Sequence, residues 1–187
     1  MRSTDFDTIL LEDALLQLFS FLPHSSVKVY LTLKLLEVGE DSTASTIEEI
    51  GVAASIPEKT VQLYIRDLVE HLLIEAVERS NPDPYKISYY GTYNEGFTRF
   101  SKSLVKDMIH CLSPSEMVLY VLLFSKSRGI NKTKTSTSQQ NLAQEIGVTL
   151  QALSLITTEL NAKGYIKKET ILIKENRKNT KYILRNN

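Results

Sequence analysis

Residues 138–166, SQQNLAQEIGVTLQALSLITTELNAKGYI, decide the fold of this chain. Ser138 and Thr149 each precede an apolar pattern of helical spacing, so each is predicted to be a helix N-cap. Gly147 predicts a tight turn between the two helices, and Gly164 predicts the end of the second helix. Two short helices joined by a tight turn indicate a helix-turn-helix.

A longer helix is predicted upstream of this pair, and a hairpin downstream. Ser113-Pro114-Ser115-Glu116 combines a capping serine, a proline at the first helical position and a glutamate three residues after the cap. Ile130 to Thr137 is predicted to be a polar loop. After Gly164 the apolar period changes from 3.6 to 2 on both sides of Asn176-Arg177-Lys178-Asn179, which predicts a β-hairpin around that turn. Three helices and a hairpin make a winged helix.

The same order of elements occurs earlier in the chain, as an internal repeat. Val27–Leu33 aligns with Met117–Leu123 at an offset of 90, and Thr46 to Ile74 aligns with Ser138 to Ile166 at an offset of 92. The two inserted residues fall in the loop after the first helix, where insertions are tolerated. The first copy is predicted to contain helices at Pro23–Val38, Thr46–Ala54 and from Pro57, and a hairpin of Leu73–Arg79 and Tyr85–Tyr90 around Asn81-Pro82-Asp83-Pro84.

The predicted fold class is therefore mainly α with small β-hairpins (α+β), as two tandem winged-helix domains joined by a helix. Two further segments, Asp5–Phe21 and Asn94–His110, are predicted to be helical. The expected division is an N-terminal winged-helix domain with its leading helix at 1–92, a connecting helix at 93–110 and a C-terminal winged-helix domain at 111–187. Each extra helix either packs on its own domain or forms the seam of a homodimer.

The net charge of zero hides an asymmetry between the two halves. Residues 1–125 contain 10 Lys/Arg and 18 Asp/Glu, a net charge of −8, whereas residues 126–187 contain 12 Lys/Arg and 4 Asp/Glu, a net charge of +8. Such a split suggests an anionic partner for the basic half. The alternative is that the two halves attract each other.

Several classes of protein do not fit this sequence. A single cysteine, Cys111, allows no intrachain disulfide and favours a reducing compartment. The chain shows no secretory signal and no apolar run of membrane-spanning length. The three histidines lack metal-ligand spacing, and the chain contains no GxxxxGK phosphate loop and no GxSxG elbow. We therefore expect a cytoplasmic, nucleoid-associated protein that is not an enzyme and binds no metal or cofactor.

The second copy carries the expected DNA interface. In a helix-turn-helix the second helix of the pair enters the major groove, where amides suit adenine and hydroxyls suit any base pair. The residues expected off its buried stripe are Thr149, Leu150, Gln151, Ser154, Thr157, Thr158 and Asn161. The hairpin would hold phosphates through the cations at and before it, which are Lys163, Lys167, Lys168, Lys174, Arg177, Lys178, Lys181 and Arg185.

The corresponding helix of the first copy has mixed charge. Its candidate DNA contacts are Lys59, Gln62 and Arg66, and these alternate with acidic residues that repel phosphates. This unit either binds DNA weakly or serves as a protein-docking or dimerisation module.

Three segments of the second half resemble a bacterial winged-helix family. They are Leu112–Tyr120 (LSPSEMVLY), Ser138–Thr149 (SQQNLAQEIGVT) and Leu160–Ile166 (LNAKGYI). The family occurs in plasmid and phage replication initiators, in DnaD-type primosome proteins and in some transcription regulators. The resemblance implies DNA binding through Thr149–Lys163 and the following wing. One departure is the absence of Arg and Lys between Thr149 and Ala162, where such families often place them.

The function expected from the sequence is double-stranded DNA binding in replication initiation or its control. The first alternative is a winged-helix regulator of transcription. The second is a protein-assembly module of the kind found in chromosome-condensation accessory proteins, which use paired winged helices without reading DNA. The acidic first unit favours a protein partner, and the basic second wing favours DNA.

Overall fold

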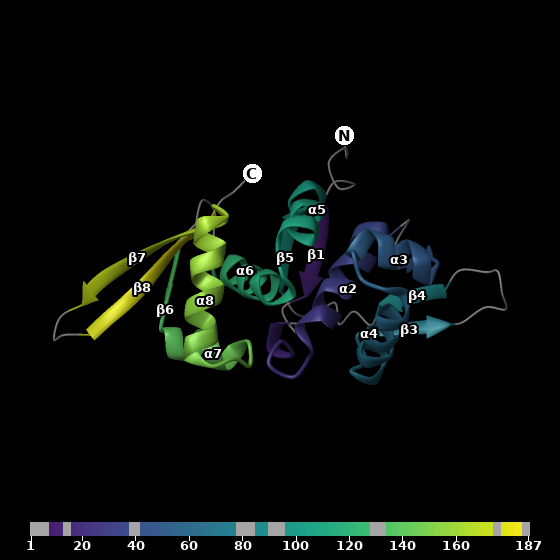
Figure 1. The fold of residues 1–187 in the computed structure, drawn as a ribbon, viewed down its shortest axis with the longest axis horizontal. Coiled ribbons are helices and arrows are strands. Elements are labelled where there is room, and N and C mark those ends of the chain that lie inside the picture. Colours follow the sequence, from purple (N-terminus) through teal and green to yellow (C-terminus); the bar gives the residue numbers. More distant parts are fainter. Residues whose placement is uncertain are drawn as a thin grey trace.

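The computed structural model describes residues 8–12, 16–37, 42–77, 85–89, 96–127, 134–173 and 177–184, and its fold is mainly helical with small antiparallel sheets (Figure 1). The first unit contains α2 (His24–Leu36), β2 (Ser42–Ser45), α3 (Ile47–Ala54), α4 (Glu58–Glu70), β3 (Ile74–Val77) and β4 (Tyr85–Tyr89). The second contains α6 (Pro114–Lys126), β6 (Lys134–Thr137), α7 (Gln139–Glu145), α8 (Leu150–Ala162), β7 (Ile166–Ile173) and β8 (Arg177–Leu184). The predicted α+β class, with two tandem winged helices, is confirmed.

The helix starts of the second unit lie where the sequence places them. Ser113 caps α6 in a reciprocal box, because its hydroxyl accepts from the Glu116 backbone and the Glu116 carboxylate accepts from the Ser113 backbone. Ser138 caps α7 and Thr149 caps α8, each by accepting a backbone N–H three residues later. These caps fix where each helix begins.

The repeat is also visible in the backbone conformation. Gly147 and Gly164, which follow α7 and α8, have φ angles of 67° and 77°. The residues 92 positions earlier, Ser55 and Leu72, both have φ of 55° and are the only non-glycine residues in the described ranges with positive φ. All four positions end a helix in the left-handed conformation that glycine tolerates best. The first unit therefore repeats the backbone of the second with residues that strain it.

Two of the predicted helices are wrong over part of their length. Thr8–Glu12 forms strand β1 and Phe97–Ser101 forms strand β5, and the two pair antiparallel. Ile9 and Phe100 lie opposite each other in this ladder, and both are buried. Each segment alternates buried and exposed side chains, as a strand does, but its partner strand lies far away in the sequence. Within the described part of the predicted connecting helix, helical structure begins at Lys102, as α5 (Lys102–Cys111).

Each hairpin also has a third strand that the sequence did not predict. Lys134–Thr137, expected in a polar loop, is strand β6 and pairs with β8, as β2 pairs with β4 in the first unit. The turn of the second hairpin also lies earlier than predicted, because Arg177 and Lys178 already belong to β8 and pair with Ile173 and Leu172 of β7. The β7–β8 ladder therefore includes Arg177, Lys178 and Asn179, which were predicted to lie in the turn. The predicted turn of the first hairpin lies outside the described residues.

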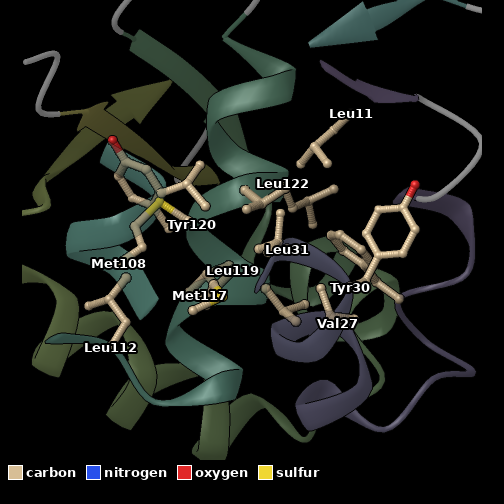
Figure 2. Packing of buried hydrophobic residues seen from close by; sticks show 14 of the residues in the cluster. Leu11, Val27, Tyr30, Leu31, Met108, Leu112, Met117, Leu119, Tyr120 and Leu122 are labelled. Atoms are coloured by element: carbon tan, nitrogen blue, oxygen red, sulfur yellow. The ribbon is translucent and has the colours of Figure 1, made fainter. Parts of the chain in front are cut away.

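The two units share one hydrophobic core. Helices α2 and α6, the first helices of the two copies, pack against each other at the centre of the molecule. Figure 2 shows Val27 and Leu31 of α2 beside Met117 and Leu119 of α6. Because one continuous cluster of buried side chains runs through both copies, each unit stabilises the other. The boundaries at residues 92 and 110 stay a prediction.

No helix in the described ranges is both long and apolar enough to span a bilayer.

Candidate nucleic-acid interface

Helix α8 presents a polar face to solvent. Gln151, Ser154, Thr158 and Asn161 are all exposed, as the helical spacing predicts. The Thr149 hydroxyl accepts the backbone N–H of Ala152 at 3.2 Å, so it is engaged as the helix cap. The face that would meet base edges therefore begins at the first turn of α8 and continues along its length.

The two threonines of this helix differ in position. Thr157 was expected on the outer face but is fully buried, because it falls on the stripe of α8 that packs inward with Leu153 and Leu160. Thr158 is exposed, and its hydroxyl donates to the Ser154 carbonyl at 2.8 Å. Its hydroxyl proton is therefore used within the helix.

Lys163, at the end of α8, is held in an internal ion pair. Its ammonium lies 2.7 Å from a carboxylate oxygen of Glu116, whose side chain is only 4% exposed, and it also donates to the Cys111 carbonyl. Burial pushes the pKa of Glu116 up, but the hydrogen bonds from Lys163 and Ser113 outweigh it and hold this pKa below its ordinary value. The charge of Lys163 is thus balanced inside the protein and ties α8 to the start of α6.

The base of the second wing also carries compensated charge. The Lys167 ammonium lies 3.2 Å from Glu169, and the Lys181 ammonium lies 3.9 Å from the same carboxylate. Three charged groups therefore leave one net positive charge at this place. Lys168, the neighbour of Lys167 on β7, is exposed. Ion pairs at the protein surface are weak, so Lys167 and Lys181 remain available to a phosphate.

Two of the remaining predicted cations belong to the outer end of the wing. Arg177 and Lys178 lie at the start of β8, and their side chains are not among those described. Lys174 and Arg185 lie outside the described residues. Strands β7 and β8 project from the second unit at the end of the molecule remote from the first wing (Figure 1). The wing therefore does not fold back onto the acidic first half.

A shallow depression connects α8 to this wing. It has a volume of about 350 Å³ and is lined by Asn161, Gly164, Ile166, Lys167, Ile183 and Leu184. Asn161 and Lys167 are its polar lining, and both are exposed. An extended anionic chain that crosses from the helix to the wing would pass over these two side chains.

The joint between the two units fixes the position of α7 and α8. The His24 ring, at the start of α2, bonds the Ser115 hydroxyl at 2.7 Å through Nδ1 and the Ile146 carbonyl at 2.8 Å through Nε2. Because a carbonyl only accepts, Nε2 carries a proton. A Cβ on Gly147 would lie 2.8 Å from the Ser20 carbonyl oxygen, so the helix-turn-helix turn touches the first half. The α7–α8 turn is thus contacted by residues of the first half as well as by its own unit.

The first unit places its three predicted residues on one helix. Lys59, Gln62 and Arg66 are exposed on α4, and the Arg66 guanidinium lies 3.8 Å from Glu70. These residues therefore share a surface with an acidic neighbour, as the sequence indicates.

One feature of the interface was missed at the sequence level. Leu155 lies on the outer face of α8 and is 66% exposed. Leu150 at the first turn, which was expected off the buried stripe, is 53% exposed. The signal was present, because Leu155 falls off the buried stripe that Leu153 and Leu160 define.

No family model matches the chain, and no curated protein matches it. The chain is similar to a solved structure of domains 2 and 3 of RctB, with 12% sequence identity and a TM-score of 0.39. The match covers 86% of this chain and 80% of that chain. This likeness is too distant to support an argument about function.

Within the described ranges, no three His, Cys, Asp or Glu side chains group as a metal site.

Proposed function

We propose that this protein binds double-stranded DNA, with α8 in the major groove and the β7–β8 wing along the phosphate backbone. The supporting observation is the combination, within one unit, of an exposed polar helix and a wing that projects away from the acidic half (Figure 1). The major groove, about 12 Å wide, admits an α-helix. Because β7 follows α8 after a short turn, both elements reach one duplex together.

The two elements have different tasks. Helix α8 contains no Lys or Arg from Leu150 to Ala162, so it supplies hydrogen bonds and apolar contact but no positive charge. The net charge of +8 in residues 126–187 resides elsewhere, and one unit of it is neutralised by Glu116, which lies outside this range and pairs with Lys163. Affinity for phosphates then comes mainly from the wing, and sequence preference from the helix.

We place this DNA binding in the initiation of replication or its control, because the second half resembles the winged-helix family of replication initiators and primosome proteins. Regulation of transcription would use the same surface. Mapping the bound chromosomal or plasmid fragments in the native host separates the two, since replication control predicts binding at origins and transcription control predicts binding at promoters.

A protein-docking role for the first unit is the second candidate. Its α4 carries Leu63, which is 50% exposed, and its α3 carries the exposed Val52. Acidic and apolar groups together suit a protein surface better than DNA. This role is compatible with DNA binding by the second unit, and it predicts that α4 substitutions leave DNA affinity unchanged.

A gel-shift titration at 50, 100 and 200 mM salt tests the proposal. Each phosphate contact contributes roughly 0.9 to the slope of log affinity against log salt, so replacing Arg177 and Lys178 together by alanine should reduce the slope by about 2. The matched control replaces Lys102 and Lys106 of α5, which removes the same charge outside the helix and wing. Absence of binding to any duplex at 50 mM salt refutes the proposal.

A further inference from the structure

The outward face of α8 has an apolar centre. Gln151, Ser154, Leu155 and Thr158 lie three and four residues apart, so they share one side of the helix. Leu155 stands in the middle of this row and is 66% exposed. The Thr158 hydroxyl proton is already donated to the Ser154 carbonyl. A surface that meets the first half of this face therefore finds the Gln151 amide next to an uncovered aliphatic side chain.

The first unit repeats this feature at the equivalent place. Leu63 of α4 precedes Leu155 by the repeat offset of 92 residues and is 50% exposed. A single exposed leucine is ordinary on a protein surface. Here, however, the same large apolar side chain stays uncovered at the same position of both repeats, so its exposure belongs to the repeated helix. In α4 it lies on a helix with several acidic residues, whereas in α8 its neighbours Ser154 and Thr158 are uncharged, so only Leu155 suits a DNA groove. Neither leucine is needed by the core, because the stripes that pack inward are formed by other residues.

We propose that Leu155 reads the C5-methyl group of thymine in the major groove, and that Gln151 pairs with a neighbouring adenine. The thymine methyl is the apolar group that an unmodified base pair presents in that groove, and an amide can bond adenine through two hydrogen bonds. This inference rests on the proposed function, because it requires α8 in the major groove. It makes the chain a reader of A·T pairs whose discrimination comes from methyl contact rather than from charge.

Replacement of thymine by deoxyuridine, which lacks only the methyl group, tests this inference. A duplex is first selected by the full-length protein from a random synthetic pool. Each thymine is then replaced in turn, and the dissociation constant is measured by fluorescence anisotropy. Synthetic duplexes contain no 5-methylcytosine, so thymine is the only source of the C5-methyl group. At one or two positions the wild-type protein should lose about fourfold in affinity, the value of one buried methyl group.

The variant Leu155→Ala should lose most of this sensitivity, with less than a twofold difference between thymine and uracil at those positions. The matched control is Leu72→Ala, which truncates a leucine that is 70% exposed but lies outside both groove-reading helices, and it should keep the full fourfold difference. Equal affinity for thymine and uracil duplexes at every position overturns the methyl-reading inference and leaves DNA binding intact. So does unchanged sensitivity in Leu155→Ala. Failure of the wild-type protein to bind any duplex overturns the proposed function itself.

Discussion

The contact between the helix-turn-helix turn and the first half can be tested by a pair of matched substitutions, Gly147→Ala and Gly164→Ala. Both glycines follow a helix end of the second unit, with φ of 67° and 77°. They differ in what surrounds them. A methyl group at position 147 would lie 2.8 Å from the carbonyl oxygen of Ser20, whereas a methyl group at position 164 would meet nothing within 4 Å.

The expected magnitudes follow from this difference. An alanine held in the left-handed conformation costs about 1–2 kcal/mol, and the smaller backbone entropy of its unfolded state offsets roughly 0.5–1 kcal/mol. Gly164→Ala should therefore lower the free energy of unfolding by about 1 kcal/mol. Gly147→Ala carries the same backbone cost plus about 1–3 kcal/mol of overpacking against a main-chain atom that cannot rotate away. Its expected total loss is about 2–4 kcal/mol.

Urea unfolding followed by far-UV circular dichroism at pH 7 measures both variants against the wild-type protein. The midpoint should fall more for Gly147→Ala than for Gly164→Ala, with the slope against urea unchanged. An equal loss of unfolding free energy in the two variants would refute the reasoning, because the 2.8 Å contact between the new methyl group and Ser20 would then not destabilise the protein. In that case the second helix-turn-helix would not be seated on the first half of the chain.

Four further predictions concern stability. Leu72→Gly should be more stable than Leu72→Ala by about 0.5–1 kcal/mol in urea unfolding, because only glycine relieves the φ of 55°, and the reverse order would contradict this. Lys163→Met should cost about 1–3 kcal/mol because it leaves the Glu116 carboxylate buried without its cation; a loss below 0.5 kcal/mol in urea would show that the pair contributes little. Since the pKa of Glu116 is held below 4.5, its contribution is complete above that pH and is lost as the pH falls through the lower folded value. The stability gap between the wild-type protein and Glu116→Gln should therefore be smaller at pH 3 than at pH 7. His24→Ala removes two hydrogen bonds between the units, so it should lower the free energy of unfolding by about 1–3 kcal/mol and lower the thermal midpoint. His71 is exposed, and His71→Ala should change the midpoint little.

The sequence alone was sufficient for the elements that rest on local chemistry. The caps Ser113, Ser138 and Thr149 each accept a hydrogen bond from the backbone N–H three residues later. Because donor and acceptor are close in sequence, the sequence alone predicts these caps. The same holds for Gly147 and Gly164, whose conformational freedom sets the helix ends. The exposure of Gln151 and Asn161 followed from the 3.6-residue period, which separates them from the buried stripe.

Only the tertiary structure decided what depends on partners far along the chain. Thr8–Glu12 becomes a strand because Phe97–Ser101 pairs with it, and a short apolar segment does not reveal its partner. Lys163 was predicted to contact phosphates, but the fold places the Glu116 carboxylate beside its ammonium. The seating of the second helix-turn-helix on Ser20 and His24 likewise requires two distant segments to meet. Local interactions are fixed by neighbouring residues, whereas pairing, burial and charge compensation depend on the packing of the whole chain.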